Sequence, residues 1–177
     1  MTQHFVIALR IDYEGEGVED ALVYTSEQWE EIYQRNVDTV YRVCFVYLKN
    51  RYDAEDAVQN TFLRLMGADV VFENPTHEKA WLIRTASNLC KDFYRHWWQK
   101  TVGLDAVAEK GEEAPPMEDD EVLRKVMALP RLQRLSILYF YYEGYSTGEI
   151  AVILDKKEST VRSYLHRGRN ALKLTWE

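Results

Sequence analysis

The chain has 177 residues, enough for one domain or two small ones, and its 22 basic and 29 acidic residues give a net charge of −7. No stretch approaches the roughly 18–20 consecutive apolar residues of a membrane span, and the N-terminus lacks the basic and then apolar order of a secretory signal. We therefore expect a cytoplasmic protein that does not insert into a membrane.

The residues that usually carry catalysis or bind metals are scattered. Cys44 and Cys90 are far apart in the sequence, and the four histidines have no metal-ligand spacing. The chain also lacks a glycine-rich phosphate loop, a GxSxG elbow and a Cys/His pairing. We therefore expect a protein that is not an enzyme, without catalytic residues, cofactor or metal, and with both cysteines reduced in a core.

Residues 1–25 form an acidic N-terminal extension with a net charge of −4. Apolar residues alternate through Phe5, Ile7, Leu9 and Ile11, and the stretch EGEG then breaks the pattern. This alternation predicts a short β-hairpin that packs on a helical domain or on a regulatory partner. A partly ordered tail is the alternative.

Residues 26–100 are predicted to form a helical domain that begins with a long amphipathic helix ending around Asn50. Its apolar residues recur at steps of three and four: Trp29, Tyr33, Val37, Val40, Cys44, Tyr47 and Leu48. Asp53 is predicted to cap the next helix, whose inward face carries Ala54, Ala57, Val58, Phe62 and Leu65.

The opposite side of this second helix is polar but carries a leucine. It is formed by Asp56, Gln59, Asn60 and Leu63. A polar face with one exposed leucine suits a protein-docking surface. An ordinary solvated face is the alternative.

A third helix is predicted through KAWLIRTASNLCKDFYRHWWQK, and its two sides differ in chemistry. The core stripe is Leu82, Thr85, Ala86, Leu89, Phe93 and Trp97. A second stripe interleaves cations with aromatics: Trp81, Arg84, Asn88, Lys91, Arg95 and Trp98. Aromatic rings can stack on bases while cations hold phosphates, so this stripe suits single-stranded nucleic acid. Alternatively, the tryptophans cap the core and the charges are solvated.

Residues 101–120 separate two domains. This stretch carries one basic and seven acidic residues, two adjacent prolines and two glycines, and has too little apolar surface for a core. It predicts a flexible acidic linker between a domain at 26–100 and a second domain at 121–177. The second domain has ten basic and six acidic residues, a net charge of +4, so it can bind phosphate although the whole chain is acidic.

The last quarter of the chain predicts a helix-turn-helix. Ser146 and Glu149 form a capping box, and an apolar face follows at Ile150, Ala151 and Leu154. Residues 155–157 break the pattern before a second helix near Glu158.

The second helix of this motif turns apolar residues inward and a cationic, hydroxyl-bearing set outward. The inward residues are Val161, Tyr164, Leu165 and Leu172. The residues expected to contact phosphates and base edges in a major groove are Ser159, Thr160, Arg162, Ser163, His166 and Arg167. A solvated helix face is the alternative.

Three strings, in this order and spacing, resemble bacterial sigma factors of the small extracytoplasmic-function (ECF) type, over about 130 residues. They are DAEDAVQNTFLRLM, AWLIRTASNLCKDFYR, and LPRLQRLSILYFYYEGYSTGEIAVILDKKESTVRSYLHRGRNALK. The resemblance implies an all-α protein of two small helical domains that binds core RNA polymerase and promoter DNA. The chain departs from the family at Asp155, where a glycine is frequent, and at Lys157, where a serine cap is common.

The resemblance also implies roles for the three faces. The helix beginning DAED would dock on the clamp helices of the largest polymerase subunit, through Asp53, Asp56, Gln59, Asn60 and Leu63. The Trp81-containing stripe and a loop at residues 74–79 would hold the melted downstream promoter element, and the loop would capture an extruded base. The helix-turn-helix would read the upstream element as a duplex, and an anti-sigma protein is a further possible partner.

Two other classes stay open at this point. A stand-alone helix-turn-helix regulator would bind duplex operator DNA tightly without polymerase, but it would leave the Trp81-containing stripe and the DAED helix without a role. A helical adaptor that does not bind DNA would show little salt dependence, whereas phosphate contacts predict a steep one.

Overall fold

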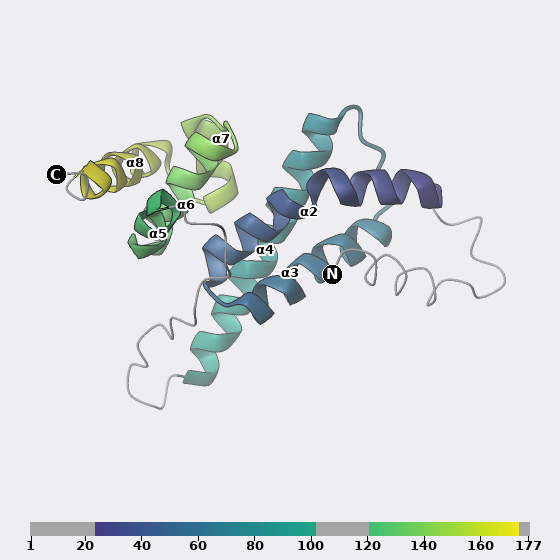
Figure 1. Ribbon diagram of the computed structural model, residues 1–177, viewed down its shortest axis with the longest axis horizontal. Coiled ribbons are helices and arrows are strands. Elements are labelled where there is room, and N and C mark those ends of the chain that lie inside the picture. The colour runs from purple at the N-terminus through teal and green to yellow at the C-terminus, as the bar shows by residue number, and fades with distance from the viewer. Residues whose placement is uncertain (1–23, 102–120, 174–177) are drawn as a thin grey trace.

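A computed structural model describes residues 24–101 and 121–173, and these residues are helical without any strand. The N-terminal helices are α2 (Ser26–Leu48), α3 (Arg51–Met66) and α4 (Pro75–Thr101). The C-terminal helices are α5 (Glu121–Ala128), α6 (Arg131–Ile137), the π-helical turn η2 (Leu138–Tyr142), α7 (Thr147–Leu154) and α8 (Glu158–Lys173). Figure 1 shows these two groups, so the predicted all-α, two-domain class is confirmed. The expected β-hairpin and acidic linker lie outside the described residues.

Local capping signals set the ends of the first helices. Thr25 and Gln28 form a capping box at the start of α2, and Lys49 ends this helix in the left-handed region at φ 57°. The N-cap of α3 is Asn50, whose side chain accepts a hydrogen bond from the Asp53 backbone at 3.1 Å. The prediction of Asp53 as the cap was therefore wrong, and this carboxylate lies instead in the first turn, where it favours the helix dipole.

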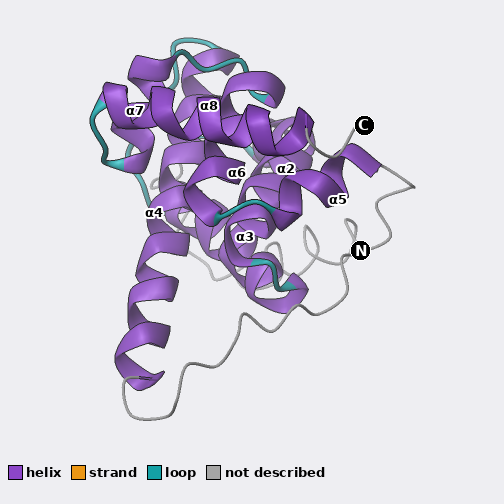
Figure 2. Ribbon diagram, turned by 90° about the vertical axis from the view of Figure 1, so that its left-hand side faces the viewer, coloured by secondary structure: helices purple, strands orange, loops and turns teal. Residues whose placement is uncertain are grey.

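Helices α2, α3 and α4 pack around a core that includes Val40, Phe62 and Leu82, all almost fully buried. The predicted core position of Phe93 was wrong, because its side chain is 41% exposed. Figure 2 shows the reason: the C-terminal part of α4 projects beyond the other helices. An apolar stripe continues along α4 past the point where neighbouring helices can cover it.

The two cysteines, distant in the sequence, are brought together in this core. Cys44 on α2 and Cys90 on α4 are both buried free thiols. A hydrogen bond with Cys44, followed by burial, raises the pKa of the Cys90 thiol above its ordinary value. Both residues therefore act as small core side chains, and the Cys90 thiol stays protonated.

The C-terminal helices share one continuous core with the N-terminal ones, and Arg134 on α6 lies at the junction. Its side chain is almost completely buried, and its guanidinium donates from Nε to the Val46 carbonyl at 2.6 Å and from Nη2 to the Tyr47 carbonyl at 3.2 Å. Its Nη1 donates to the Leu129 carbonyl at 3.2 Å. Because the last carbonyls of a helix lack partners within it, Arg134 joins α6 to the end of α2.

Arg131, one turn before Arg134, adds an aromatic contact at the same junction. Its guanidinium lies 3.9 Å from the ring centroid of Tyr94 on α4 and 5.6 Å from that of Tyr47 on α2. An Arg guanidinium is attracted by the face of an aromatic ring. Two arginines of α6 thus fix the C-terminal helices against both long helices of the N-terminal group.

The helix-turn-helix forms where the sequence predicts it. Ser146 and Glu149 make the capping box of α7, and Asp155 ends this helix in the left-handed region at φ 54°. Helix α8 begins at Glu158 and packs on α6 through Gly168, where a Cβ atom would lie only 3.0 Å from Ile137 Cγ1. The small residue at 168 lets α8 approach α6 closely, and this sets the position of the exposed side of α8.

We predict that Arg134→Ala lowers the free energy of unfolding by about 2–4 kcal/mol, because three buried carbonyls lose their charged donor. Urea unfolding followed by tryptophan fluorescence measures this change. The control is Arg124→Ala, which removes an exposed arginine from α5 and should cost less than about 0.5 kcal/mol. Equal effects of the two substitutions would contradict the role of Arg134.

Candidate functional site

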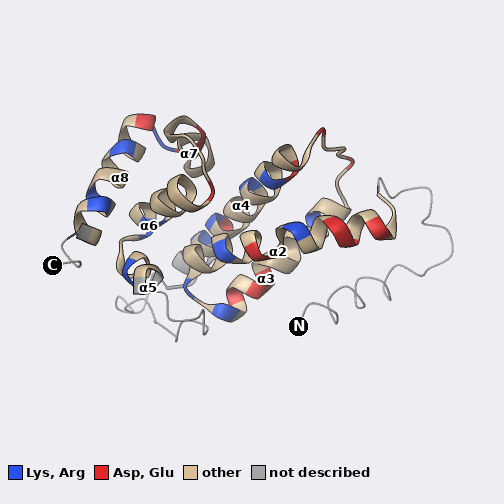
Figure 3. Ribbon diagram, turned by 45° about the horizontal axis from the view of Figure 1, so that its top comes forward, with Lys and Arg blue, Asp and Glu red and all other residues tan. Residues whose placement is uncertain are grey.

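The exposed side of α8 carries the residues predicted to contact duplex DNA. Ser159, Arg162, Ser163, His166 and Arg167 are exposed, and Thr160 is half-buried. On the opposite side, Val161 and Leu165 are buried against the rest of the domain. Figure 3 shows the basic residues spaced along α8. The predicted division of this helix into a core side and a cationic side is therefore confirmed.

Short contacts hold the start of α8 against α7. The Thr147 hydroxyl donates to Glu158 Oε1 at 2.6 Å, and Arg162 Nη2 forms an ion pair with the same oxygen at 2.6 Å. The hydrogen bond from Thr147, followed by that from Arg162, lowers the pKa of Glu158. This carboxylate, at the first position of α8, therefore stays ionised and ties the two helices of the motif together.

Further along α8, two side chains of the DNA-facing set are held by neighbours on the same helix. Arg167 Nε donates to the Ser163 carbonyl at 3.3 Å, and its guanidinium lies 5.4 Å from the centroid of the Tyr164 ring. His166 Nε2 and Asn170 Nδ2 lie 3.1 Å apart. These contacts pre-orient cations and hydrogen-bonding groups on the exposed side.

The stripe on α4 is less uniform than the sequence predicts. Arg84, Asn88 and Arg95 are exposed, but Trp81 is half-buried and contacts Phe72 edge-to-face at a centroid distance of 6.0 Å. The Trp98 side chain lies outside the described residues. The stripe therefore presents cations and an amide to solvent, with an aromatic group at its N-terminal end.

The predicted outward position of Lys91 in this stripe was wrong, because its side chain is half-buried and bonded to another helix. Its Nζ donates to the Ile153 carbonyl near the end of α7 at 2.8 Å. Burial lowers the pKa of Lys91, and nearby Asp155 partly opposes this shift. A lysine at a helix C-terminus is favoured by the helix dipole, so Lys91 attaches α7 to α4.

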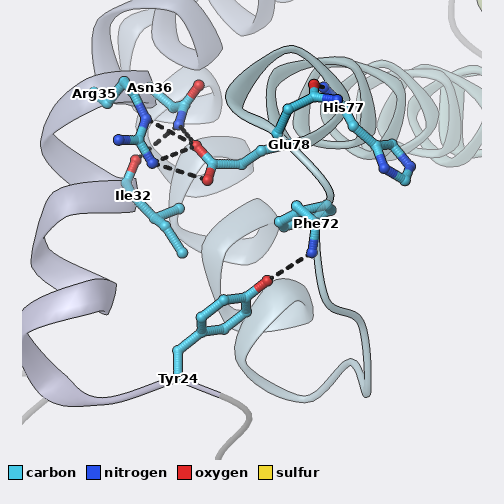
Figure 4. A network of polar contacts seen from close by, with 8 residues as sticks. Tyr24, Ile32, Arg35, Asn36, Phe72, His77 and Glu78 are labelled. Carbon is cyan, nitrogen blue, oxygen red and sulfur yellow. Dashed lines mark hydrogen bonds and ion pairs between the residues drawn. The ribbon is translucent and has the colours of Figure 1, made fainter.

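A polar network holds the first turn of α4. The loop predicted at residues 74–79 is wrong, because α4 begins at Pro75 and the Asn74 side chain accepts a hydrogen bond from the His77 backbone at 2.8 Å. The Glu78 side chain is buried, and its carboxylate accepts hydrogen bonds from Arg35 and Asn36 of α2, including one from Arg35 Nη2 at 2.9 Å. The hydrogen bond with Glu78 raises the pKa of Arg35. As Figure 4 shows, the Tyr24 hydroxyl also accepts a hydrogen bond from the Phe72 backbone at 3.1 Å.

Sequence reasoning missed this network, although a signal for it was present. Asn36 lies between Tyr33 and Val40 in the apolar stripe of α2, so its position predicts a buried amide that needs a polar partner. The partner, Glu78, is 42 residues away in the sequence. The need for a partner could be inferred from the sequence, but the identity of the partner could not.

The outer face of α3 carries the predicted docking residues. Asp56, Gln59 and Asn60 are exposed, Asp53 is half-buried, and Leu63 is 46% exposed. The Asn60 side chain donates to the Asp56 carbonyl one turn earlier at 2.8 Å. This face thus offers an apolar side chain among amide and carboxylate groups.

Within the described ranges, no three His, Cys, Asp or Glu side chains gather in a way that could hold a metal ion. The helices of those ranges also include none that is both long enough and apolar enough to cross a membrane. The surfaces described above offer cations, hydroxyls, amides, aromatic rings and an exposed leucine, which are groups suited to recognition.

Comparison with known proteins identifies the family. The model for Sigma-70 region 2 matches residues 32–99, and the model for Sigma-70 region 4 matches residues 119–172. The ECF RNA polymerase sigma factor SigL of Mycobacterium tuberculosis is 30% identical over 152 residues, which cover 81% of this chain and 86% of that relative. The chain belongs to the ECF family of RNA polymerase sigma factors. It is therefore a factor for promoter-specific initiation of transcription, and the stand-alone regulator is not favoured.

Two further similarities agree with this assignment. The ECF RNA polymerase sigma factor SigE of Mycolicibacterium smegmatis is 29% identical over 157 residues, which cover 82% of this chain and 60% of that relative, so the chain spans little more than half of SigE. The sigma factor RpoE of Bartonella quintana, solved in complex with the anti-sigma factor NepR, has the same fold with a TM-score of 0.64 at 19% identity. That match covers 83% of this chain and 95% of RpoE.

We predict that Glu78→Ala loosens the first turn of α4 and the residues just before it, because Arg35 and the buried Asn36 lose their shared acceptor. The free energy of unfolding should fall by about 1–3 kcal/mol. Hydrogen exchange of the amides between Phe72 and Glu78 should become faster. The control is Glu73→Ala, which removes an exposed carboxylate of the same segment and should leave both measurements unchanged. Unchanged exchange in the Glu78 variant would show that the network does not hold this segment.

Proposed function

We propose that this sigma factor uses three separate surfaces: α3 for core RNA polymerase, α8 for a duplex upstream element, and α4 with residues 74–79 for the melted downstream element. On this proposal the domains span residues 26–100 and 121–177, and 101–120 link them. The observation that carries the proposal is the chemistry of α8, whose outer side gathers arginines and hydroxyls while its inner side is buried. Such a helix fits a major groove.

The outer side of α8 suits base reading. Arg162 and Arg167 can each pair with the two acceptors of a guanine, and Ser159, Thr160 and Ser163 can bond bases or phosphates. His166 adds a further group on the same side. The ion pair between Arg162 and Glu158 is largely exposed, so water screens it and the arginine can exchange its partner for DNA.

The α4 surface suits an unpaired strand. Trp81 and Phe72 lie at its N-terminal end, where an extruded base could stack, and Arg84, Asn88 and Arg95 follow along the helix. We assign Lys91 and Trp98 to the same surface. Flipping a base costs a few kcal/mol, and stacking on aromatic rings offsets this cost. The network around Glu78 supports the proposal because it fixes the segment where capture would occur.

The α3 surface suits a protein partner. Leu63 provides an apolar contact, and Asp53, Asp56, Gln59 and Asn60 surround it with acceptors and amides. An apolar centre with a polar rim is the usual anatomy of an interface. We assign this surface to the clamp helices of the largest polymerase subunit.

The proposed role is binding, and RNA synthesis is carried out by the polymerase. Such a protein acts in the cytoplasm, where bacterial polymerase and chromosome meet. The structure of RpoE with NepR supports an anti-sigma protein as a further partner, because that sigma factor has the same fold.

We expect Arg162→Ala and Arg167→Ala to weaken recognition of the upstream element by roughly tenfold or more each, because each removes a candidate base contact. Run-off transcription on a pool of genomic fragments, with core polymerase and each variant, measures this loss. Pull-down of core polymerase by the same variants should be unchanged. Equal loss of transcription and polymerase binding would contradict the separation of the two surfaces.

Leu63→Asp should have the opposite pattern and weaken the pull-down of core polymerase by more than about tenfold, because a charge replaces the apolar centre of the docking surface. The control is Val71→Asp, which should leave the pull-down unchanged. Val71 is more exposed than Leu63 and lies outside α3. Polymerase binding that survives Leu63→Asp would show that α3 is not the docking helix.

A further inference from the structure

A single carboxylate of the C-terminal helices binds two cations of the N-terminal helices. Glu143, which follows η2, forms an ion pair through Oε1 with Arg42 Nη1 on α2 at 3.1 Å. Its Oε2 forms an ion pair with Lys79 Nζ on α4 at 2.7 Å. The Glu143 side chain is 1% exposed, whereas those of Arg42 and Lys79 are 32% and 35% exposed. One negative charge is thus enclosed by two positive charges that solvent still reaches.

Lys79 belongs to the segment proposed to hold the melted strand, and Arg42 lies beside it on the same carboxylate. Lys79 ends the segment 74–79 and directly follows Glu78, whose partner Arg35 lies seven residues before Arg42 on α2. Residues seven apart share one side of a helix, so Arg35 and Arg42 both face the start of α4. Arg35 is neutralised by Glu78 within the N-terminal group, whereas the ion pairs of Arg42 and Lys79 cross to the other group.

We propose that Arg42 and Lys79 form a further binding site for a phosphate of the melted strand, and that Glu143 occupies this site as a stand-in while the two groups of helices are docked. This inference rests on the proposed role of α4. A carboxylate with a cation on each oxygen presents the same two-oxygen pattern as a phosphodiester, and an Arg guanidinium suits both anions. Two cations around one carboxylate leave an excess positive charge, which also favours an anion.

The docked C-terminal helices also contact α4 further along its length. Lys91, which we assign to the strand-binding surface, donates to the Ile153 carbonyl, and Ser87 shares a hydrogen bond of 2.6 Å with Tyr139. A strand held both at residues 74–79 and at Lys91 would therefore meet the enclosed carboxylate and the end of α7. Strand binding and docking compete for the same cations, so a strand that binds there favours the undocked arrangement.

The test is binding of the full-length protein to a fluorescein-labelled single-stranded oligothymidine of 20 nucleotides, followed by anisotropy over a series of salt concentrations. Glu143→Gln should tighten binding by about three- to tenfold and steepen the slope of log K against log salt by about 0.7, the contribution of one further phosphate on a single strand. Adding Arg42→Gln and Lys79→Gln to the Glu143→Gln variant should restore the wild-type affinity and slope.

Two control variants distinguish exposure of the Arg42–Lys79 site from undocking alone and from a change in net charge. Arg42→Gln/Lys79→Gln breaks the same two ion pairs but removes the cations, so it should not bind more tightly than the wild type. Glu55→Gln removes a carboxylate from the surface pair with Arg51 and should leave the slope unchanged. Equal tightening by Glu143→Gln and Arg42→Gln/Lys79→Gln, or an unchanged slope in Glu143→Gln, would overturn the inference.

The role of α4 is judged separately. Trp81→Ala/Arg84→Ala should weaken oligothymidine binding in both the wild-type and the Glu143→Gln backgrounds. If this variant binds normally while Glu143→Gln still steepens the slope, the assignment of the α4 stripe is wrong and the Arg42–Lys79 site stands. Thermal melting of every variant checks folding, and Glu143→Ala carries the same expectation should the glutamine variant melt early.

Discussion

The arrangement of the C-terminal helices depends on one buried guanidinium. Arg134 places its donors on the carbonyls of Val46 and Tyr47, which lie in the last turn of α2 and cannot find partners within that helix. The negative end of the helix dipole favours a cation at this point. A lysine could not make the same set of bonds, because its single ammonium lacks the planar fork of an arginine. Helix α6 is therefore fixed on α2, and α8 takes its position from α6.

Around this fixed point the junction combines two kinds of contact. Leu135 and Leu138 are buried in the shared core and contribute through loss of apolar surface from water. Glu143 and Lys91 contribute polar contacts that water or another polar partner could replace. Taking charges out of water is costly, so the net gain from the Glu143 ion pairs is smaller than their short distances suggest. The polar part of the junction is therefore the part that a competing ligand can displace.

Local signals in the sequence predicted most of the helices and the side of each that is exposed. The capping box of Ser146 and Glu149 needs only four consecutive residues, and Asp155 in the left-handed turn completes a motif of short range. The cap at Asn50 was missed because Asp53 is an equally good capping residue and the sequence gives no means of choosing between them.

What the sequence could not predict depends on contacts between distant segments. Cys44 and Cys90 meet only when α2 packs on α4, and the projection of α4 that exposes Phe93 depends on where the neighbouring helices end. The capture of Lys91 by the end of α7 requires the two domains to dock, which no periodicity within one helix encodes. The family resemblance supplied the roles of the surfaces, but the contacts between the domains came from the structure.

The docked arrangement affects the two proposed DNA surfaces unequally. The outer side of α8 is exposed, and its ion pair between Arg162 and Glu158 lies within the helix, so this surface can meet duplex DNA while the domains stay docked. On α4, Lys91 and Lys79 are both engaged by the C-terminal helices. Reading the duplex therefore requires no rearrangement, whereas holding the melted strand along all of α4 requires the domains to separate. If the two surfaces act as proposed, the order of contacts is duplex first and single strand second.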